Sequence, residues 1–132
     1  MQLVQNATAR ILTRCKKHDH ITPCLAQLHW LPVKFRITFK ILLLAYKALH
    51  HTGPEYLSNL LTRYVPACKL RSSDSGLLVI PKQKCTTLGE HSFSFMAPTL
   101  RNSLPALVRD PTVARFKSAL KVHLFSLAFH AL

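Results

Sequence analysis

Proline spacing limits the elements that this chain can form. Five prolines each precede an apolar stretch with helical spacing, and these are Pro23, Pro32, Pro54, Pro98 and Pro111. Proline suits the first position of a helix, because the N–H that it lacks would have no partner there and its φ is already helical. The spacing therefore predicts short helices that begin at these prolines, with Thr22 and Asp110 as N-caps.

Apolar residues recur at helical spacing in about five segments. We expect helices over residues 2–17, 23–29, 32–50, 54–64 and 112–129, with a helical turn near 98–104. The first is amphipathic, and the last is apolar on two sides, which indicates a neighbour for its second face. The third resembles a central core helix, in which one stripe is expected to be the only part in water: Arg36, Lys40, Lys47 and His50.

The pattern changes between the fourth helix and the C-terminal helices. Residues 65–74 have the composition of a loop, Gly76 opens an apolar run of strand length over 77–80, and 86–88 and 92–95 are further strand candidates. These segments predict a short antiparallel β-hairpin. The expected fold is therefore a mainly α, small helical domain over 1–132, with a helical part (1–64), a loop and hairpin part (65–105) and a C-terminal helix (106–132).

The charge of the chain is strongly unbalanced. Eighteen Lys and Arg residues stand against five Asp and Glu residues, which gives a net charge of +13. Nucleic acid is the commonest partner of such a chain, because each neutralised phosphate releases condensed counterions. We expect weakly specific contacts to the phosphate backbone of RNA or DNA from nine residues. They are Arg10, Arg14, Lys16, Lys17, Arg36, Lys40, Lys47, Lys82 and Lys84.

A membrane is the first rival to nucleic acid as an anionic partner. The longest apolar run covers only residues 41–46 between Lys40 and Lys47, far short of the roughly 20 residues that a spanning helix needs. Residues 1–14 lack the continuous apolar core of a secretory signal. We therefore expect an intracellular protein, nuclear or cytoplasmic, with no membrane partner and with reduced thiols.

The sequence contains none of the catalytic motifs that its acidic, nucleophilic or glycine residues could have formed. The five acidic residues are scattered along the sequence and form no pair for a two-metal site. They are Asp19, Glu55, Asp74, Glu90 and Asp110. No nucleophile elbow is present, and the three glycines form no phosphate-binding loop. The sequence therefore predicts a protein without enzyme activity or a cofactor.

One local cluster has the spacing of metal ligands. It reads C-x2-H-x-H-x3-C and consists of Cys15, His18, His20 and Cys24, a ligand set that zinc accepts. The alternative is ordinary packing, because Cys15 falls on the apolar face of the first helix and Cys24 in the first turn of the second. Packing is the favoured interpretation, so no metal site is predicted.

Two further features also have two interpretations. Trp30 could stack on a base, but its position between helices and its apolar neighbours favour a core anchor. The basic corner near the end of the first helix could complement the helix dipole or contact phosphate, and these roles are compatible. That corner consists of Lys16, Lys17, His18 and His20.

A series of short motifs carries a family resemblance over nearly the whole chain. The motifs are Gln5-Asn6-Ala7, Ala9-Arg10, His20-Ile21-Thr22-Pro23, Leu28-His29-Trp30-Leu31-Pro32-Val33, Phe39-Lys40, Tyr46-Lys47-Ala48-Leu49-His50, Pro54-Glu55-Tyr56-Leu57, Leu70-Arg71-Ser72-Ser73, Ala97-Pro98, Asn102-Ser103-Leu104-Pro105 and Phe116-Lys117-Ser118. Their order resembles the C-terminal part of the reverse-transcriptase polyprotein of LINE-type, non-LTR retrotransposons of vertebrate genomes. Arg101 stands where the family pattern has Trp, and Cys15 and Cys24 stand where it has Thr and an aliphatic residue, which indicates that the Cys/His cluster is incidental.

The resemblance implies a position downstream of the polymerase palm, in a protein that also carries an endonuclease. Neither active site lies in this segment, so no catalytic role passes to any residue here, and Met1 directly before the motifs indicates a truncated copy. We expect a non-catalytic, basic remnant that contacts nucleic acid, alone or with the rest of a reverse transcriptase. The alternative is a purely structural fragment that packs on the polymerase thumb, which the second apolar face of the last helix favours.

Overall fold

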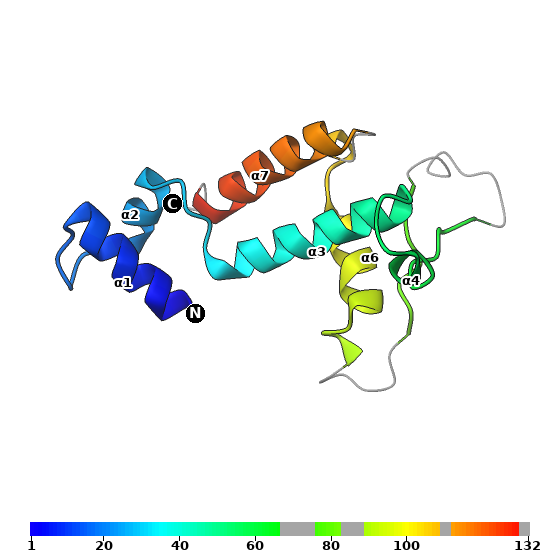
Figure 1. Cartoon of the computed structure of the whole chain (residues 1–132), viewed down its shortest axis with the longest axis horizontal. Coiled ribbons are helices and arrows are strands. Elements are labelled where there is room, and N and C mark those ends of the chain that lie inside the picture. The colour runs from blue at the N-terminus through cyan, green and yellow to red at the C-terminus, as the bar shows by residue number, and fades with distance from the viewer. Residues whose placement is uncertain (67–75, 83–88, 109–111, 130–132) are drawn as a thin grey trace. The chain divides into compact units, whose positions relative to one another are not determined.

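The computed structural model describes residues 1–66, 76–82, 89–108 and 112–129, and it confirms the mainly helical class (Figure 1). The described helices are α1 (Gln2–Thr13), α2 (Ile21–Gln27), α3 (Val33–Leu49), α4 (Glu55–Ser58), α6 (Phe93–Ser103), the 3₁₀ helix η2 (Ala106–Val108) and α7 (Val113–Phe129). In this part of the chain no helix is both long enough and apolar enough to cross a bilayer.

The chain divides into two compact units. Unit 1 comprises Met1–Phe39 and Leu120–Leu132, and unit 2 comprises Lys40–Ala119. In unit 2, the second half of α3 contributes Ala45, Ala48 and Leu49 to an apolar core that also contains Leu61 and Leu78. Ala97 from α6 completes the buried set, and the side chains packed against it are Ile41, Leu57 and Phe93.

The predicted β-hairpin is absent from the described residues. Residues 93–95, expected in a strand, begin α6, because Phe93 and Ala97 both reach the core at the i, i+4 spacing of a helix. Residues 86–88 lie outside the described residues. The apolar run at 77–80 instead pairs with the segment after α4 through an isolated antiparallel bridge between Arg63 and Leu78.

Backbone hydrogen bonds flank this bridge on both sides. The N–H of Tyr64 donates to the Leu77 carbonyl, and the N–H of Val79 donates to the Thr62 carbonyl, each at 2.9 Å. This pairing also explains why α4 ends at Ser58 instead of continuing to residue 64 as expected. The residues that would have extended the helix use their backbone groups for turns and for the bridge.

Asn102 closes the other side of the bridged segment. Its side-chain Oδ1 accepts the Leu78 N–H at 3.0 Å, and its Nδ2 donates to the Leu78 carbonyl at 2.8 Å. The amide therefore acts as a one-residue substitute for a neighbouring strand, which satisfies backbone groups of a buried residue. The structural role of Asn102 therefore accounts for one residue of the motif at 102–105.

We expect the Asn102→Ala variant to lose about 2–3 kcal/mol of unfolding free energy, because both Leu78 backbone groups lose the partners that the amide provides. Chemical denaturation monitored by circular dichroism measures the loss. Ser103→Ala is the matched control at the neighbouring exposed position and should change stability by less than about 0.5 kcal/mol. Equal, small losses for the two variants would contradict the structural role of Asn102.

The prolines stand near the helix starts but not at the predicted first positions. Pro32 and Pro54 immediately precede α3 and α4, and Pro23 is the third residue of α2, where the missing N–H still lacks an intrahelical partner. Pro98 lies inside α6, where full burial of its ring offsets a lost helical hydrogen bond. His20, not Thr22, is the N-cap of α2. The predictions at Asp110 and Pro111 lie outside the described residues.

Helix α1 ends four residues earlier than expected. Arg14 adopts the left-handed conformation with φ of 51°, and its N–H donates to the Arg10 carbonyl, which terminates the helix at Thr13. The following residues form a loop instead of another helical turn, because the Asp19 carboxylate accepts the backbone N–H of Lys16 at 2.8 Å.

Helix α1 packs on α2 with its polar side chains inward. Gln5 Nε2 donates to the Leu31 carbonyl at 2.9 Å, and Gln2 Oε1 accepts the Val33 N–H at 2.8 Å. The second contact satisfies the first N–H of α3, so Gln2 caps that helix from outside. The apolar face of α1 is left in water, where Leu3 is 83% exposed and Ile11 is 78% exposed.

Candidate nucleic-acid interface

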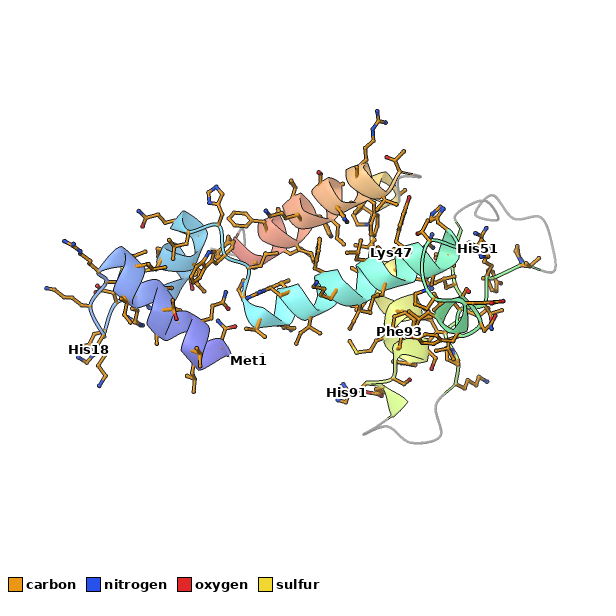
Figure 2. The ribbon with its side chains drawn as sticks, viewed as in Figure 1. Met1, His18, Lys47, His51, His91 and Phe93 are labelled. Carbon is orange, nitrogen blue, oxygen red and sulfur yellow. The ribbon has the colours of Figure 1, made fainter. Side chains whose placement is uncertain are left out.

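The loop between α1 and α2 presents the densest group of predicted phosphate contacts. Arg14, Lys16 and Lys17 are all exposed, and Figure 2 shows His18 at the outer tip of the same loop. His20 is exposed as well. Arg14 thus joins the four residues of the basic corner predicted from the sequence, and from here on the basic corner means these five residues, which the fold leaves accessible to a ligand.

Arg10 has a structural role in this loop. Its guanidinium donates to two backbone carbonyl oxygens of the loop, those of Lys16 and Asp19, the latter at 2.9 Å. The Asp19 carboxylate is engaged by the Lys16 N–H within the same loop. Arg10 therefore holds the loop in shape and lets the cations of the basic corner point outward.

The stripe on α3 is accessible, but it is not the only accessible part of that helix. Arg36, in unit 1, and Lys40 and His50, in unit 2, are exposed, whereas Lys47 is half-buried. Ile37 is 54% exposed, so the expectation that only the stripe lies in water is wrong. The reason is that the buried residues of α3 lie in its second half, from Leu42 to Leu49, and apolar side chains outside that set keep contact with solvent.

The remaining predicted contact in the described part of the chain is Lys82, which is exposed, while Lys84 lies outside the described residues. Five further lysine and arginine side chains are exposed but were not among the predicted phosphate contacts. They are Lys34, Arg63, Arg115, Lys117 and Lys121. A high net charge predicts that such residues exist, but exposure depends on packing that no local pattern specifies.

The two thiols of the Cys/His cluster lie close together. Cys24 is buried, Cys15 is half-buried, and both are free cysteines. The hydrogen bond between the thiols raises the pKa of Cys15 and lowers the pKa of Cys24, and the Thr13 hydroxyl lies 3.1 Å from Cys15 Sγ. Within the described residues, no three His, Cys, Asp or Glu side chains converge to hold a metal ion. The fold thus pairs the thiols without bringing His18 and His20 to them.

Aromatic side chains are a minor part of the accessible surface. Trp30 is half-buried, with its backbone N–H donating to the Leu25 carbonyl at 2.9 Å. Tyr56 and Tyr64 are the exposed aromatic residues among the described positions. Exposed cations greatly outnumber them, so the surface is better suited to phosphates than to stacked bases.

A second concentration of positive charge lies in unit 2, at the C-terminal end of α3. Partial burial of the imidazole ring lowers the pKa of His50, although the residue as a whole is exposed, and the positive charges of Arg101, Arg63 and His51 lower it further. The His50 ring also packs on Tyr46, with 4.3 Å between ring centroids. Within the part of the chain that the structure describes, the charged neighbours that shift this imidazole are therefore all basic.

No family model, curated protein or solved structure matches this chain. The resemblance to a reverse transcriptase therefore depends on the order of the short motifs alone. Residues from two of these motifs, Gln5 and Asn102, hold backbone groups of other segments in the structure.

Proposed function

We propose that this chain is a non-catalytic module that binds the phosphate backbone of RNA or DNA, as a remnant of a LINE-type reverse transcriptase. The observation that carries the proposal is the basic corner. Its cations all lie in water, and the acidic residue beside them, Asp19, is already engaged by the loop backbone. A phosphate can approach this corner without first displacing a carboxylate.

The expected binding is electrostatic and weakly specific. Each lysine or arginine that meets a phosphate releases condensed counterions, which supplies affinity without reading the base. The lysines and Arg14 of the corner are long, exposed side chains that can follow a backbone of any sequence. We therefore expect similar affinities for unrelated sequences of equal length and strandedness.

The triple variant Arg14→Gln, Lys16→Gln, Lys17→Gln tests the proposal directly. We expect weaker binding to every nucleic acid tested, and a salt slope smaller by about 2.7, which is three times the 0.9 expected for each phosphate contact. Stability should change little, because exposed substitutions usually stay within about 0.5 kcal/mol. Fluorescence anisotropy at several salt concentrations measures both quantities.

The matched control for this variant keeps the three charges but exchanges the side chains: Arg14→Lys, Lys16→Arg, Lys17→Arg. It should bind nearly as well as the original chain. A second comparison removes the charges of Arg36, Lys40 and Lys47 and shows whether the α3 stripe adds contacts of its own. Unchanged affinity in both glutamine variants would overturn the proposed role of these residues.

The outward apolar face of α1 favours a second candidate function, a structural fragment that packs against another part of a reverse transcriptase. Val122 on α7, 70% exposed, and the exposed Leu127 favour the same candidate. If it is correct, the isolated chain should self-associate in sedimentation velocity and lack a cooperative thermal transition. A monomer that melts cooperatively would support an independent binding module instead.

A further inference from the structure

We propose that His50, Arg63 and Arg101 form a phosphate-binding subsite at the C-terminal end of α3. The inference rests on the proposed function and deepens it, because it assigns a defined place in unit 2 to one backbone phosphate of the bound nucleic acid. Arg63 and Arg101 do not belong to the nine residues that the sequence predicted as phosphate contacts.

The backbone segment around Leu78 contacts both arginines. Arg63 is the bridge partner of Leu78, and the guanidinium of Arg101 donates to the carbonyl of Gly76, two residues earlier. Asn102, next to Arg101, holds Leu78 from the opposite side through both of its side-chain polar atoms. Both arginines therefore extend from a backbone that is fixed by hydrogen bonds.

Arg63 also reaches the end of α3. Its Nη2 donates to the Leu49 carbonyl at 3.4 Å, and Leu49 directly precedes His50. This contact uses one of the five N–H donors of the guanidinium, so the planar fork retains donors for an anion. In Figure 2, His51 and Lys47 are labelled at the same end of α3, and this end of the helix carries basic side chains on successive turns.

His50 responds to this surrounding charge. The charged groups that lower its pKa are Arg101, Arg63 and His51, after burial as the largest cause, and packing against Tyr46 holds the ring in place. A positive guanidinium near an imidazole disfavours the protonated form of the ring, and an oxyanion bound to Arg63 would offset that effect. A phosphate also matches the arginine fork geometrically, because two of its oxygens can accept parallel N–H bonds.

The alternative is that Arg63 only complements the negative end of the α3 dipole. In that case an added anion would leave His50 unaffected. His50 thus serves as a built-in reporter, because a phosphate beside Arg63 offsets the positive potential and favours the protonated imidazole.

The experiment is an NMR pH titration of the imidazole of His50 in the full chain. It is recorded in chloride, in inorganic phosphate at equal ionic strength, and with a short oligothymidylate. We expect both phosphate ligands to raise the pKa of His50, and Arg63→Gln to abolish the rise and weaken phosphate binding at least about tenfold. Arg115→Gln removes the same charge from another exposed position of unit 2 and should preserve the rise.

The three ligand conditions separate failure of the subsite from failure of the proposed function. Oligothymidylate that binds without changing His50, together with no response to inorganic phosphate, would overturn the subsite and leave nucleic-acid binding intact. A response to inorganic phosphate without oligothymidylate binding would support the subsite and refute the proposed function. If Arg63→Gln does not fold, Arg63→Lys decides, because it keeps the charge but loses the fork, and an unreduced phosphate affinity in that variant would contradict the proposed geometry.

Discussion

Raising the salt concentration from about 50 to about 200 mM should lower the affinity for duplex DNA roughly 150-fold, if about four phosphates are neutralised. The corresponding slope of log K against log salt is about −3.6. The physical reason is that salt removes the entropy gained when condensed counterions leave the DNA. The chain offers ample charge for this effect, with a net charge of +13 and the exposed cations of the basic corner.

The slope is measured by titration of a labelled duplex at several salt concentrations. A second duplex of equal length and unrelated sequence is the control, and it should give the same slope and a similar affinity. A slope near zero would show that binding does not depend on phosphate contacts. Tight binding to only one of the two duplexes would show that the protein reads bases, which also contradicts the prediction.

Phe116→Ala should lower the free energy of unfolding by about 3–5 kcal/mol, the range for removal of a buried phenylalanine. The Phe116 side chain is 3% exposed, and its ring stacks on Tyr46 with centroids 4.2 Å apart and an interplanar angle of 17°. The substitution removes the stacking contact and leaves a cavity beside α3. Because small domains have only about 5–15 kcal/mol of stability, the variant should be marginally folded.

Denaturant unfolding compares this variant with Lys117→Ala, a substitution at the next position along α7, where the side chain is exposed. The control should remain within about 0.5 kcal/mol of the original chain. A loss below about 1 kcal/mol for Phe116→Ala would contradict the packing of α7 on Tyr46 in unit 2. Phe116→Leu, which keeps most of the apolar volume, should fall between the two.

Local periodicity predicted the long helices well. The expected helix over 32–50 is α3 and the one over 112–129 is α7, each within a residue at either end. One of the two apolar sides expected for α7 is buried, at Phe116, Leu120 and Leu124. A long helix repeats its pattern many times, so its period can be read without knowledge of its neighbours. Leu127, three residues after Leu124, is exposed, because burial also needs a partner surface.

The sequence predicted which type of residue the candidate site would contain, but not how the fold would arrange those side chains. A large excess of lysine and arginine indicates phosphate contacts, and most of the predicted residues in the described part of the chain are exposed. Arg10 also holds a loop in shape, because its guanidinium donates to two backbone carbonyl oxygens of that loop. The hydrogen bond from Arg63 to the Leu49 carbonyl, beside His50, joins residues that are distant in the chain, which composition cannot place together.

By itself, the sequence determined the helical class, the bounds of α3 and α7 and the positive charge, because each follows from composition or from a repeated local pattern. Only the tertiary structure decided that the 77–80 segment pairs with residues after α4 and that 93–103 is a helix. It also decided that α1 turns Gln2 and Gln5 inward and its apolar face outward. These outcomes depend on which distant segment offers a partner for each backbone group and each apolar face, and a single segment of sequence does not contain that information.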